Sequence, residues 1–354
     1  MSDFNNKVVA PISVIIPVYN CENYLEETVN SVLAQPLKVM DIILINDGST
    51  DSSGSLCETL AQKHNCIHVI HQKNAGVSVA RNAGIEYVLT YSDSTYMMFL
   101  DSDDCWQKDW LTDAVVELLH EGHDTVAFDA AHTNHALTRR NITSHMFTGV
   151  MNGGDQAVAA DHQHFGATAF RCDFMCTSSI RFHEGQKWAE DTIFIQETRS
   201  LAQTCCFVEK LVYLYRNRPG SAIKSRINAI GYYTTLFDEW IKTQHFLGEH
   251  GFTGTTSPGA IKWYMNDMCI EHFREYGSRA ELLDAIAEYA DYLELDDHLS
   301  PTEKAHKYLE RYSRRYEYKQ RLLGTILRAA RRLSRIPVVG FIRDIRRYNI
   351  PIEM

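Results

Sequence analysis

Short apolar runs alternate with amphipathic segments over the first hundred residues, and this alternation limits the fold more than any other feature of the sequence. The apolar runs predict strands at 12–19, 41–47, 67–70 and 96–100. The segments between them predict helices at 22–34, 51–63 and 77–89, the second with Ser49, Thr50 or Asp51 as its N-cap. Strands that alternate with helices form a mostly parallel sheet covered on both faces, so the sequence predicts an α/β fold.

Polar residues gather where the predicted strands end. The clusters are Tyr19-Asn20, Asp47-Gly48-Ser49, Asn74-Ala75-Gly76 and Asp101-Ser102-Asp103. In a parallel α/β sheet the ligand binds beyond the carboxyl ends of the strands. We therefore expect a ligand site at this edge of the sheet.

The acidic run 101–104 directly follows the apolar run 96–100. Three carboxylates at the mouth of a buried strand repel one another unless a cation lies among them. A divalent metal that carries a phosphorylated substrate meets this requirement. An acidic turn that ends the strand and caps a helix starting near Gln107 is the alternative.

The pattern after about residue 120 is less regular. Apolar runs predict strands at 124–128, 167–174 and 206–215, and a helix is predicted at 190–201. The polar, glycine-containing segment 139–154 predicts a loop or lid. Beyond about residue 227 the sequence is typical of helices.

Charge is divided unevenly along the chain. Residues 301–354 carry 14 Lys or Arg and 5 Asp or Glu, a net charge of +9, whereas residues 1–300 carry 21 basic and 40 acidic residues, a net charge of −19. The chain has no apolar run of the roughly 18 residues that a spanning helix needs, and its first residues lack a signal-peptide pattern. Nine scattered cysteines without a CxxC pair predict reduced thiols in a cytoplasmic protein rather than a zinc site.

Six motifs, in this order, resemble family 2 of the glycosyltransferases. They are Ser13 to Asn20, Asp47 to Asp51, Asn74 to Gly76, Ala80 to Gly84, Asp101 to Asp104, and Glu190-Asp191. The resemblance covers residues 10–225 and implies a catalytic domain of the GT-A fold that transfers a sugar from a nucleotide donor with inversion. A helical region at 226–300 and the basic segment 301–354 are expected to follow it.

The resemblance assigns the base of the donor to the ends of the first two strands. Pro17, Tyr19 and Asn20 are expected to contact the nucleotide base, and Asp47 to accept a hydrogen bond from a ring N–H. For Asp47, a purely structural role in an Asp-Gly-Ser turn is the alternative.

Asn74 and Gly76 precede the predicted helix that carries Arg81, and the resemblance places all three at the donor. Gly76 would permit a ligand to approach the backbone closely. Arg81 lies about one turn into the helix, where it can reach a phosphate or form an ion pair with Asp101 or Asp103. Both interpretations of Arg81 stay open.

The resemblance also implies a metal cofactor, Mn²⁺ or Mg²⁺. Asp103 is expected to bind the metal directly, and Asp101 to contact the ribose or a metal-bound water, with Ser102 in the same donor-binding segment. Asp104 is expected to cap the next helix. Many relatives supply a further ligand from a later segment, but 215–221 shows no clear counterpart.

Two arginines of that later segment, Arg216 and Arg218, are candidates for a contact with the diphosphate instead of a metal ligand. An arginine suits this role because its guanidinium can bind phosphate oxygens in a bidentate manner.

Glu190 and Asp191 open a predicted helix, where plain capping by the helix dipole is the alternative to a chemical role. By resemblance, Asp191 is the catalytic base and Glu190 its neighbour. An inverting transfer needs one carboxylate that accepts the proton of the acceptor hydroxyl. Nearby, Trp188 and His183 are expected either to stack on a sugar ring or to pack in a core or lid.

Four further histidines are candidate metal ligands, with surface or acceptor-site positions as the alternative. They are His132, His135, His162 and His164.

The basic segment contains a run, 319–336, with leucines at helical spacing and arginines mainly on the flanks and the opposite face. A basic amphipathic helix is typical of segments that bind an anionic membrane surface. Packing on the acidic body and a homo-oligomer contact are the alternatives. The acidic body argues against a nucleic-acid partner.

The sequence therefore predicts a metal-dependent glycosyltransferase that uses a nucleotide sugar, by resemblance a UDP-sugar, and a glycan or lipid-linked acceptor of a bacterial surface polysaccharide. It is expected at the inner face of the plasma membrane. A nucleotidyltransferase is one alternative, although 17–21 is not a glycine-rich phosphate loop. A non-catalytic nucleotide-sugar-binding module is another, and the presence of both Asp103 and Asp191 argues against it.

Overall fold

The structure, a computed structural model, describes residues 9–137, 140–143, 148–154, 165–186, 190–218, 229–249, 279–289 and 298–310. The chain divides into two compact units, Met1–Ser257 and Pro258–Met354. The first unit contains a sheet, its covering helices and helix α8 (Ala229–Glu249), and the second contains α10 (Arg279–Glu288) and a helical segment at 301–310. The break after Ser257 leaves α8 with the sheet, whereas the sequence analysis ended that domain at residue 225.

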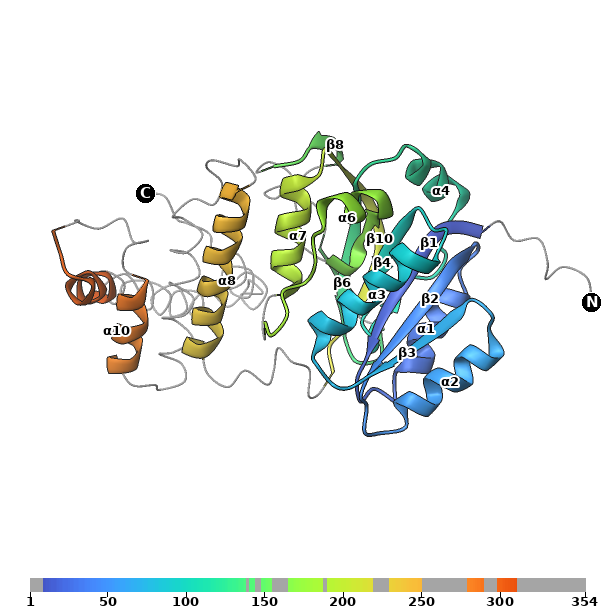
Figure 1. Cartoon of the computed structure of the whole chain (residues 1–354), viewed down its shortest axis with the longest axis horizontal. Coiled ribbons are helices and arrows are strands. Elements are labelled where there is room, and N and C mark those ends of the chain that lie inside the picture. Colours follow the sequence, from blue (N-terminus) through green and yellow to red (C-terminus); the bar gives the residue numbers. More distant parts are fainter. Residues whose placement is uncertain are drawn as a thin grey trace, which may run out of the picture. The chain divides into compact units, whose positions relative to one another are not determined.

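A mixed sheet of ten strands forms the centre of the first unit (Figure 1). Its order is β3-β2-β1-β4-β9-β6-β10-β5, with β7 paired to β6 and β8 paired to β10. The strands are β1 (Val9–Val18), β2 (Lys38–Asp47), β3 (Ile67–Gln72), β4 (Tyr96–Phe99), β5 (Cys105–Trp106), β6 (Thr125–Thr133), β7 (Arg140–Thr143), β8 (Gly149–Asn152), β9 (Thr168–Arg171) and β10 (Thr204–Arg216).

The first four strands are parallel to one another, as the sequence predicts. Three helices connect them: α1 (Leu25–Leu33), α2 (Ser53–Lys63) and α3 (Val77–Tyr91). The N-cap prediction for the second helix is wrong by one residue, because Ser52 occupies that position. Asp51 instead accepts a hydrogen bond from the backbone N–H of Ser53, at 2.9 Å.

Successive residues of the parallel strands enter two separate cores, one on each face of the sheet. Val14 packs with α1 and α2 residues in one core, while its neighbour Ile15 packs with α3 residues in the other. The same alternation is seen at Leu44 and Ile45 of β2. Strands buried on both faces have continuous apolar runs, which is why the sequence shows these strands clearly.

Helix α3 packs closely on β1 at a glycine. A Cβ placed on Gly84 would lie 2.3 Å from the Cγ2 atom of Ile15. The Gly84 position therefore sets how near the helix that carries Arg81 lies to the first strand.

The second half of the sheet departs from the expected elements. The predicted strand 167–174 ends at Arg171 and continues as helix α6 (Cys172–Ser178). The predicted loop 139–154 contains strands β7 and β8, which pair antiparallel with β6 and β10. The β8 and β9 differences arise because pairing with distant strands overrides local patterns, whereas β7 pairs with β6, its neighbour in the sequence. Helices α4 (Asp113–His120) and α7 (Glu190–Leu201) complete the unit.

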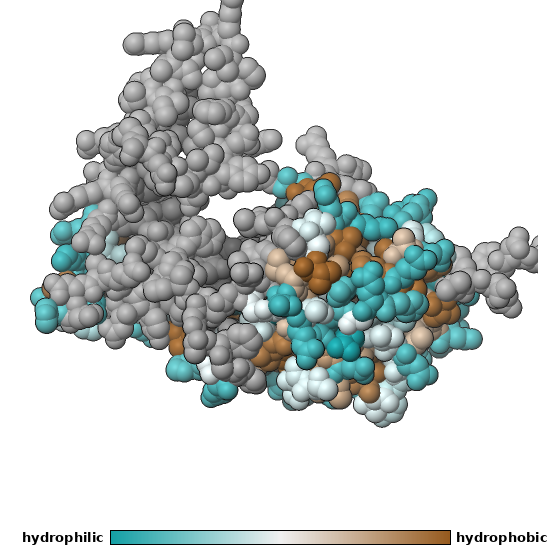
Figure 2. All heavy atoms as spheres, turned by 90° about the horizontal axis from the view of Figure 1, so that it is seen from above, coloured by the Kyte–Doolittle hydropathy of each residue, from teal (hydrophilic) through white to brown (hydrophobic). Residues whose placement is uncertain are grey.

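Large hydrophobic side chains on the described surface are dispersed. Figure 2 shows hydrophilic residues interspersed with hydrophobic ones over one face of the described part of the first unit. The exposed large hydrophobic residues are Val9, Tyr19, Val77, Tyr91, Ile142 and Val150. Among the helices that the structure describes, none combines the length and the apolar character needed to cross a bilayer.

Candidate active site

The loops that follow β1 and β2 are tied together by one asparagine. Asn20 has a left-handed backbone, with φ of 48°, and its Oδ1 accepts hydrogen bonds from the backbone N–H groups of Thr50 at 2.8 Å and Asp51 at 3.4 Å. Its own N–H donates to Ser49 Oγ at 3.2 Å. The predicted base-binding residue Asn20 therefore joins the two loops.

Beside it, Tyr19 leaves its side chain half exposed at the end of β1, while Pro17 lies within the strand. An aromatic ring that is held by a rigid strand end and open to solvent is suited to stacking on a planar base.

Asp47 holds the start of the next crossover. Its carboxylate accepts hydrogen bonds from Gln72 Nε2 at 2.8 Å and from the N–H groups of Ala75 and Gly76, both at 2.9 Å. This contact fixes the 74–76 turn from the neighbouring strand. Asp47 therefore has a structural role, but its backbone partners lie in the 74–76 turn and not in its own Asp-Gly-Ser turn.

The glycine requirement differs between the two turns. Gly76 has φ of 96°, a left-handed conformation, but a Cβ there would meet nothing within 4 Å. At Gly48 a Cβ would lie 2.7 Å from the backbone nitrogen of Asn74. The close approach is therefore between the two turns at Gly48, and Gly76 is needed for its backbone conformation.

Arg81 binds two carboxylates from distant parts of the chain. Its Nη2 lies 2.8 Å from Asp101 Oδ1, and its Nη1 lies 2.9 Å from Glu190 Oε1. The guanidinium is 3% exposed and lies over the ring of Phe165, 4.4 Å from its centroid. Burial alone would lower the pKa of Arg81, but Asp101 and Glu190 more than offset this and raise it. The ion-pair interpretation of Arg81 is confirmed.

Asp103 faces Arg218, which binds it through Nε and also lies over the ring of Tyr24. The pKa of Asp103 is raised, first by burial and then by the charge of Asp101, and Arg218 offsets part of that increase. A cation beside Asp103 is therefore favoured electrostatically. Two carboxylates of this kind fit Mn²⁺ or Mg²⁺, which take only one or two protein carboxylates when a phosphate supplies oxygens.

A metal held by protein alone finds less support. Within the described ranges, no three His, Cys, Asp or Glu side chains gather closely enough to hold a metal ion. Among the described residues, a metal at Asp103 and Asp101 would thus have no third His, Cys, Asp or Glu ligand.

The prediction that Asp104 caps a helix is wrong. Asp104 is 1% exposed, and its carboxylate accepts hydrogen bonds from Tyr213 Oη at 2.6 Å and from the N–H of Arg216 at 2.7 Å. The next helix begins at Asp113, after strand β5. Burial, followed by the charges of Asp103 and Asp101, raises the pKa of Asp104 well above its ordinary value. Asp104 anchors the acidic turn to β10.

Arg216 is structural as well. It is 4% exposed and donates hydrogen bonds to Glu27 Oε2 at 2.7 Å and to the carbonyl oxygens of Asp103 at 2.8 Å and His135 at 2.7 Å. Of the two arginines considered for the diphosphate, Arg218 is the one whose guanidinium binds the Asp103 carboxylate.

Glu190 and Asp191 begin α7, and Asp191 Oδ1 accepts a hydrogen bond from the N–H of Thr192 at 2.7 Å. Glu190 binds Arg81, yet its pKa is raised because burial outweighs the lowering effect of that cation. Through Arg81, the start of α7 lies next to the acidic end of β4. The predicted base and the predicted metal ligands thus belong to one site.

Of the remaining candidate residues from the sequence, three lie in the described part of the chain and three do not. His183 pairs with Glu197, 3.0 Å away. His132 packs against Tyr215, with ring centroids 5.1 Å apart, and His135 lies edge-on to Tyr24 at 5.9 Å. Trp188, His162 and His164 lie outside the described residues.

Three aromatic residues of the site were missed by the sequence analysis: Tyr24, Phe165 and Tyr213. Tyr213 donates to Asp104 and accepts, at 3.2 Å, from the N–H of Asp101. None of the three lies in a recognisable motif, and their roles depend on contacts with residues far away in sequence. Pattern analysis carried no signal for them.

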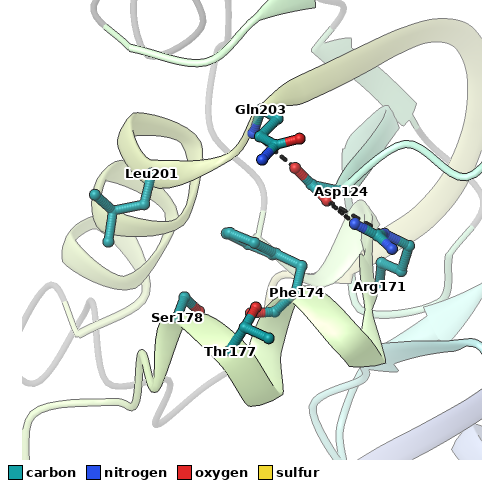
Figure 3. A pocket seen from close by; sticks show the side chains of 7 residues that line it. All are labelled: Asp124, Arg171, Phe174, Thr177, Ser178, Leu201 and Gln203. Carbon is teal, nitrogen blue, oxygen red and sulfur yellow. Dashed lines mark hydrogen bonds and ion pairs between the residues drawn. The ribbon is translucent and has the colours of Figure 1, made fainter.

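A cavity of about 280 Å³ lies elsewhere, and Figure 3 shows its side chains. Asp124 and Gln203 precede β6 and β10, at the amino ends of these strands. Asp124 binds Arg171 and accepts from the N–H of Gln203 at 2.6 Å. Since ligands of α/β sheets bind at the carboxyl ends of the strands, this hollow is not the candidate active site.

The domain has a largely parallel α/β sheet with acidic residues at the carboxyl end of its fourth strand. A second acidic pair, on a later helix, faces them. These features define a domain of the GT-A class. Residues 13–180 match the model of the family described as Glycosyl transferase family 2, so the chain contains a domain of this family.

Curated relatives are bacterial. The chain is 30% identical to the glycosyltransferase GlyA of Streptococcus pneumoniae over 59% of its own length and 31% of that protein. It is 27% identical to EpsJ of Bacillus subtilis, described as an uncharacterized glycosyltransferase, over 69% of the chain and 71% of EpsJ. It is 32% identical to the minor teichoic acid biosynthesis protein GgaA of the same organism, over 58% of the chain and 47% of GgaA. The chain therefore spans only part of these relatives.

Among solved structures, S. aureus TarS residues 1–349 in complex with UDP-GlcNAc has the same fold. The TM-score is 0.58 at 18% identity, covering 79% of this chain and 81% of that one. A complex of the same TarS fragment with UDP has a TM-score of 0.56.

Proposed function

We propose that this chain is an inverting glycosyltransferase that transfers a sugar from a nucleoside-diphosphate donor, a UDP-sugar, to a hydroxyl of a glycan or lipid-linked acceptor. The observation that carries the proposal is the Arg81 bridge between Asp101 and Glu190. It joins an acidic strand end suited to a metal that carries a diphosphate with an acidic helix start suited to proton transfer.

In this proposal the donor lies across the carboxyl ends of β1, β2 and β4. Tyr19 stacks on the base, and the turns held by Asn20 and Asp47 form its seat. Asp103, with Asp101, would hold Mn²⁺ or Mg²⁺, which would supply positive charge to the leaving diphosphate. Arg218 lies against Asp103 and adds a second cation to the same leaving group.

Asp191 acts as the base. A carboxylate near the acceptor hydroxyl takes its proton as the oxygen attacks the anomeric carbon, and a single displacement of this kind needs no nucleophile from the protein. Glu190 holds Arg81, which in turn orients Asp101. This arrangement supports different tasks for the two adjacent acids.

The acceptor belongs to a bacterial surface polysaccharide or teichoic acid. Support comes from relatives such as GgaA, whose name refers to teichoic acid biosynthesis. The TarS complex with UDP-GlcNAc supports the choice of a uridine donor.

A thermal-shift panel of nucleotide sugars with and without Mn²⁺ tests donor binding. A ligand at 100 times its Kd stabilises the folded state by about 2.7 kcal/mol, so a UDP-sugar should raise the Tm measurably. Asp103→Asn should remove the part that depends on Mn²⁺. If no nucleotide sugar shifts the Tm, the proposal fails.

Hydrolysis separates an enzyme from a binding module. The enzyme should release UDP slowly from the bound sugar in the absence of an acceptor, in a manner that depends on Mn²⁺. Binding without any release of UDP would support a non-catalytic module instead.

A further inference from the structure

A chain of side chains leads from the surface of the sheet edge to the turn after β2. Glu58 Oε1 on α2 lies 2.8 Å from His71 Nε2 on β3, and His71 Nδ1 lies 2.9 Å from Asn46 Nδ2 on β2. Asn46 Oδ1 accepts from the N–H of Ser49 at 3.1 Å. None of the family-like motifs includes Glu58 or His71.

The sheet and helix α2 hold the residues of this hydrogen-bonded series close together. Asn46 and His71 are register partners in the parallel β2–β3 pair, and Asn46 is 8% exposed. A Cβ on Gly54 of α2 would lie 2.9 Å from Asn46 Nδ2. The glycine therefore leaves room for the Asn46 amide beneath the helix.

The hydrogen-bonded series ends at residues 47–51, the turn after β2, which we call the donor turn. Ser49 Oγ accepts from the N–H of Asn20 and donates to the carbonyl oxygen of Val18 at 3.5 Å. Asn46 thus anchors the turn from one side, and Asn20 ties it to β1 from the other.

Hydrogen-bond chemistry allows only one protonation state in this chain. The Ser49 N–H can only donate, so the amide oxygen of Asn46 must face it and the amide NH₂ must face His71. His71 Nδ1 must then accept, while its Nε2–H donates to the carboxylate of Glu58. All three bonds form together only when His71 is neutral.

A proton on Nδ1 breaks the pattern. The protonated Nδ1 would be a donor that faces the NH₂ group of Asn46, which is also a donor. If the Asn46 amide turned over, its NH₂ group would face the Ser49 N–H, which again brings two donors together. Within the described residues, Glu58 is the charged group that hydrogen-bonds His71, and the β2 partner, Asn46, does not titrate.

We propose that His71 is a positioning residue for the donor turn, holding Ser49 through Asn46 only while its imidazole is neutral, so that nucleotide affinity falls as His71 is protonated. This inference rests on the proposed function for its ligand but not for the behaviour of the turn itself.

Two measurements on the full chain test the proposal, at pH 8.0 and at pH 5.5. The first is the hydrogen-exchange protection factor of residues 47–51 without ligand. The second is the Kd for UDP with Mn²⁺ by calorimetry. On acidification, the protection factor of the unsubstituted protein should fall about fivefold, the effect of one lost hydrogen bond. Its Kd should rise about fivefold more than the Kd of His71→Phe does.

Substitutions test the direction in which pH changes the protection of the turn. His71→Phe should show weak protection of the turn at both pH values. Asn46→Asp accepts at both ends, so it should protect the turn better at pH 5.5, the reverse of the unsubstituted protein. His68→Phe is the matched control, because His68 also lies on β3 but binds Asp41, away from the turn. It should behave as the unsubstituted protein does.

Because the phosphate of UDP itself titrates near a pKa of about 6, only the difference between variants counts for the Kd. Equal pH responses in the unsubstituted protein and in His71→Phe would overturn the proposal and leave the donor site intact. A pH-dependent turn without any binding of UDP would uphold the positioning role and contradict the proposed function.

Discussion

At Arg81 a single guanidinium binds two carboxylates, Asp101 and Glu190, that come from different ends of the domain. A lysine cannot replace it, because an ammonium is a point charge and does not bridge two acids in the fixed geometry of a fork. Arg81→Lys should leave one partly buried carboxylate without its partner.

We expect Arg81→Lys to lower the free energy of unfolding, measured with urea, by about 1–3 kcal/mol. It should also lower the rate of UDP release in a steady-state assay. Arg181→Lys is the matched control, since Arg181 pairs with the exposed Glu86 and such pairs contribute only about 0–1 kcal/mol. Equal effects of the two substitutions would contradict the bridge.

Glu190 makes stability depend on pH. Its pKa in the folded protein is raised by burial, so the folded state binds a proton more tightly than the unfolded state, whose glutamates titrate near about 4.3. The resulting stability is present below that value and is lost as the pH rises through the folded pKa.

Glu190→Gln should flatten this part of the profile. Urea unfolding at pH 5.0 and pH 7.5 should show a smaller decrease in stability for the variant than for the unsubstituted protein, with one proton contributing at most about 1.4 kcal/mol per pH unit. Identical slopes would show that Glu190 is not desolvated as the structure indicates.

At the level of elements, the contact of α3 with β1 controls the position of Arg81. Gly84→Ala should cost about 1–3 kcal/mol of stability, because the added methyl group meets Ile15 in a packed core. Gly248→Ala in α8 is the matched control: a Cβ there meets nothing within 4 Å, so the substitution should be neutral or stabilise by up to about 1 kcal/mol. Thermal unfolding distinguishes the two, and equal effects would contradict the close packing.

The parallel half of the sheet could be predicted from the sequence because its strands are buried on both faces and its crossover helices are amphipathic. The carboxyl-end location of Asp47 and Asp101 followed from the same order of elements. The other half of the sheet could not be predicted so well. β7, β8 and β9 are only four residues long, and the pairing partners of β8 and β9 lie far away in sequence.

Site details escaped prediction for a related reason. Whether Asp104 caps a helix or is buried against Tyr213 depends on where β10 lies, which no local pattern specifies. The ion-pair role of Arg81 was open in the sequence because Glu190 comes from another element. Contacts between distant segments, rather than propensities, decided both cases.

At the level of the whole molecule, the net charge of the sequence changes sign at about residue 300, from −19 over residues 1–300 to +9 over residues 301–354. The acidic first 300 residues contain the candidate active site, whereas the basic run 319–336 lies outside the described residues. We propose that the run binds anionic lipid headgroups, each basic residue contributing roughly 1 kcal/mol near such a surface.

A truncation after Glu310 tests this proposal by sedimentation with liposomes that contain anionic lipid. The full chain should pellet and the truncated chain should stay in the supernatant, with neutral liposomes as the control. Equal pelleting of the two chains would contradict a membrane role for the run.

The most direct measurement of the whole proposal is the behaviour of Asp191→Asn. If Asp191 is the base of a single displacement, the variant should bind a UDP-sugar with Mn²⁺ within about twofold of the normal Kd, yet release UDP at least about 100-fold more slowly, the usual contribution of a general base. An Asp191→Asn variant that keeps its full rate would contradict the assignment of the active site.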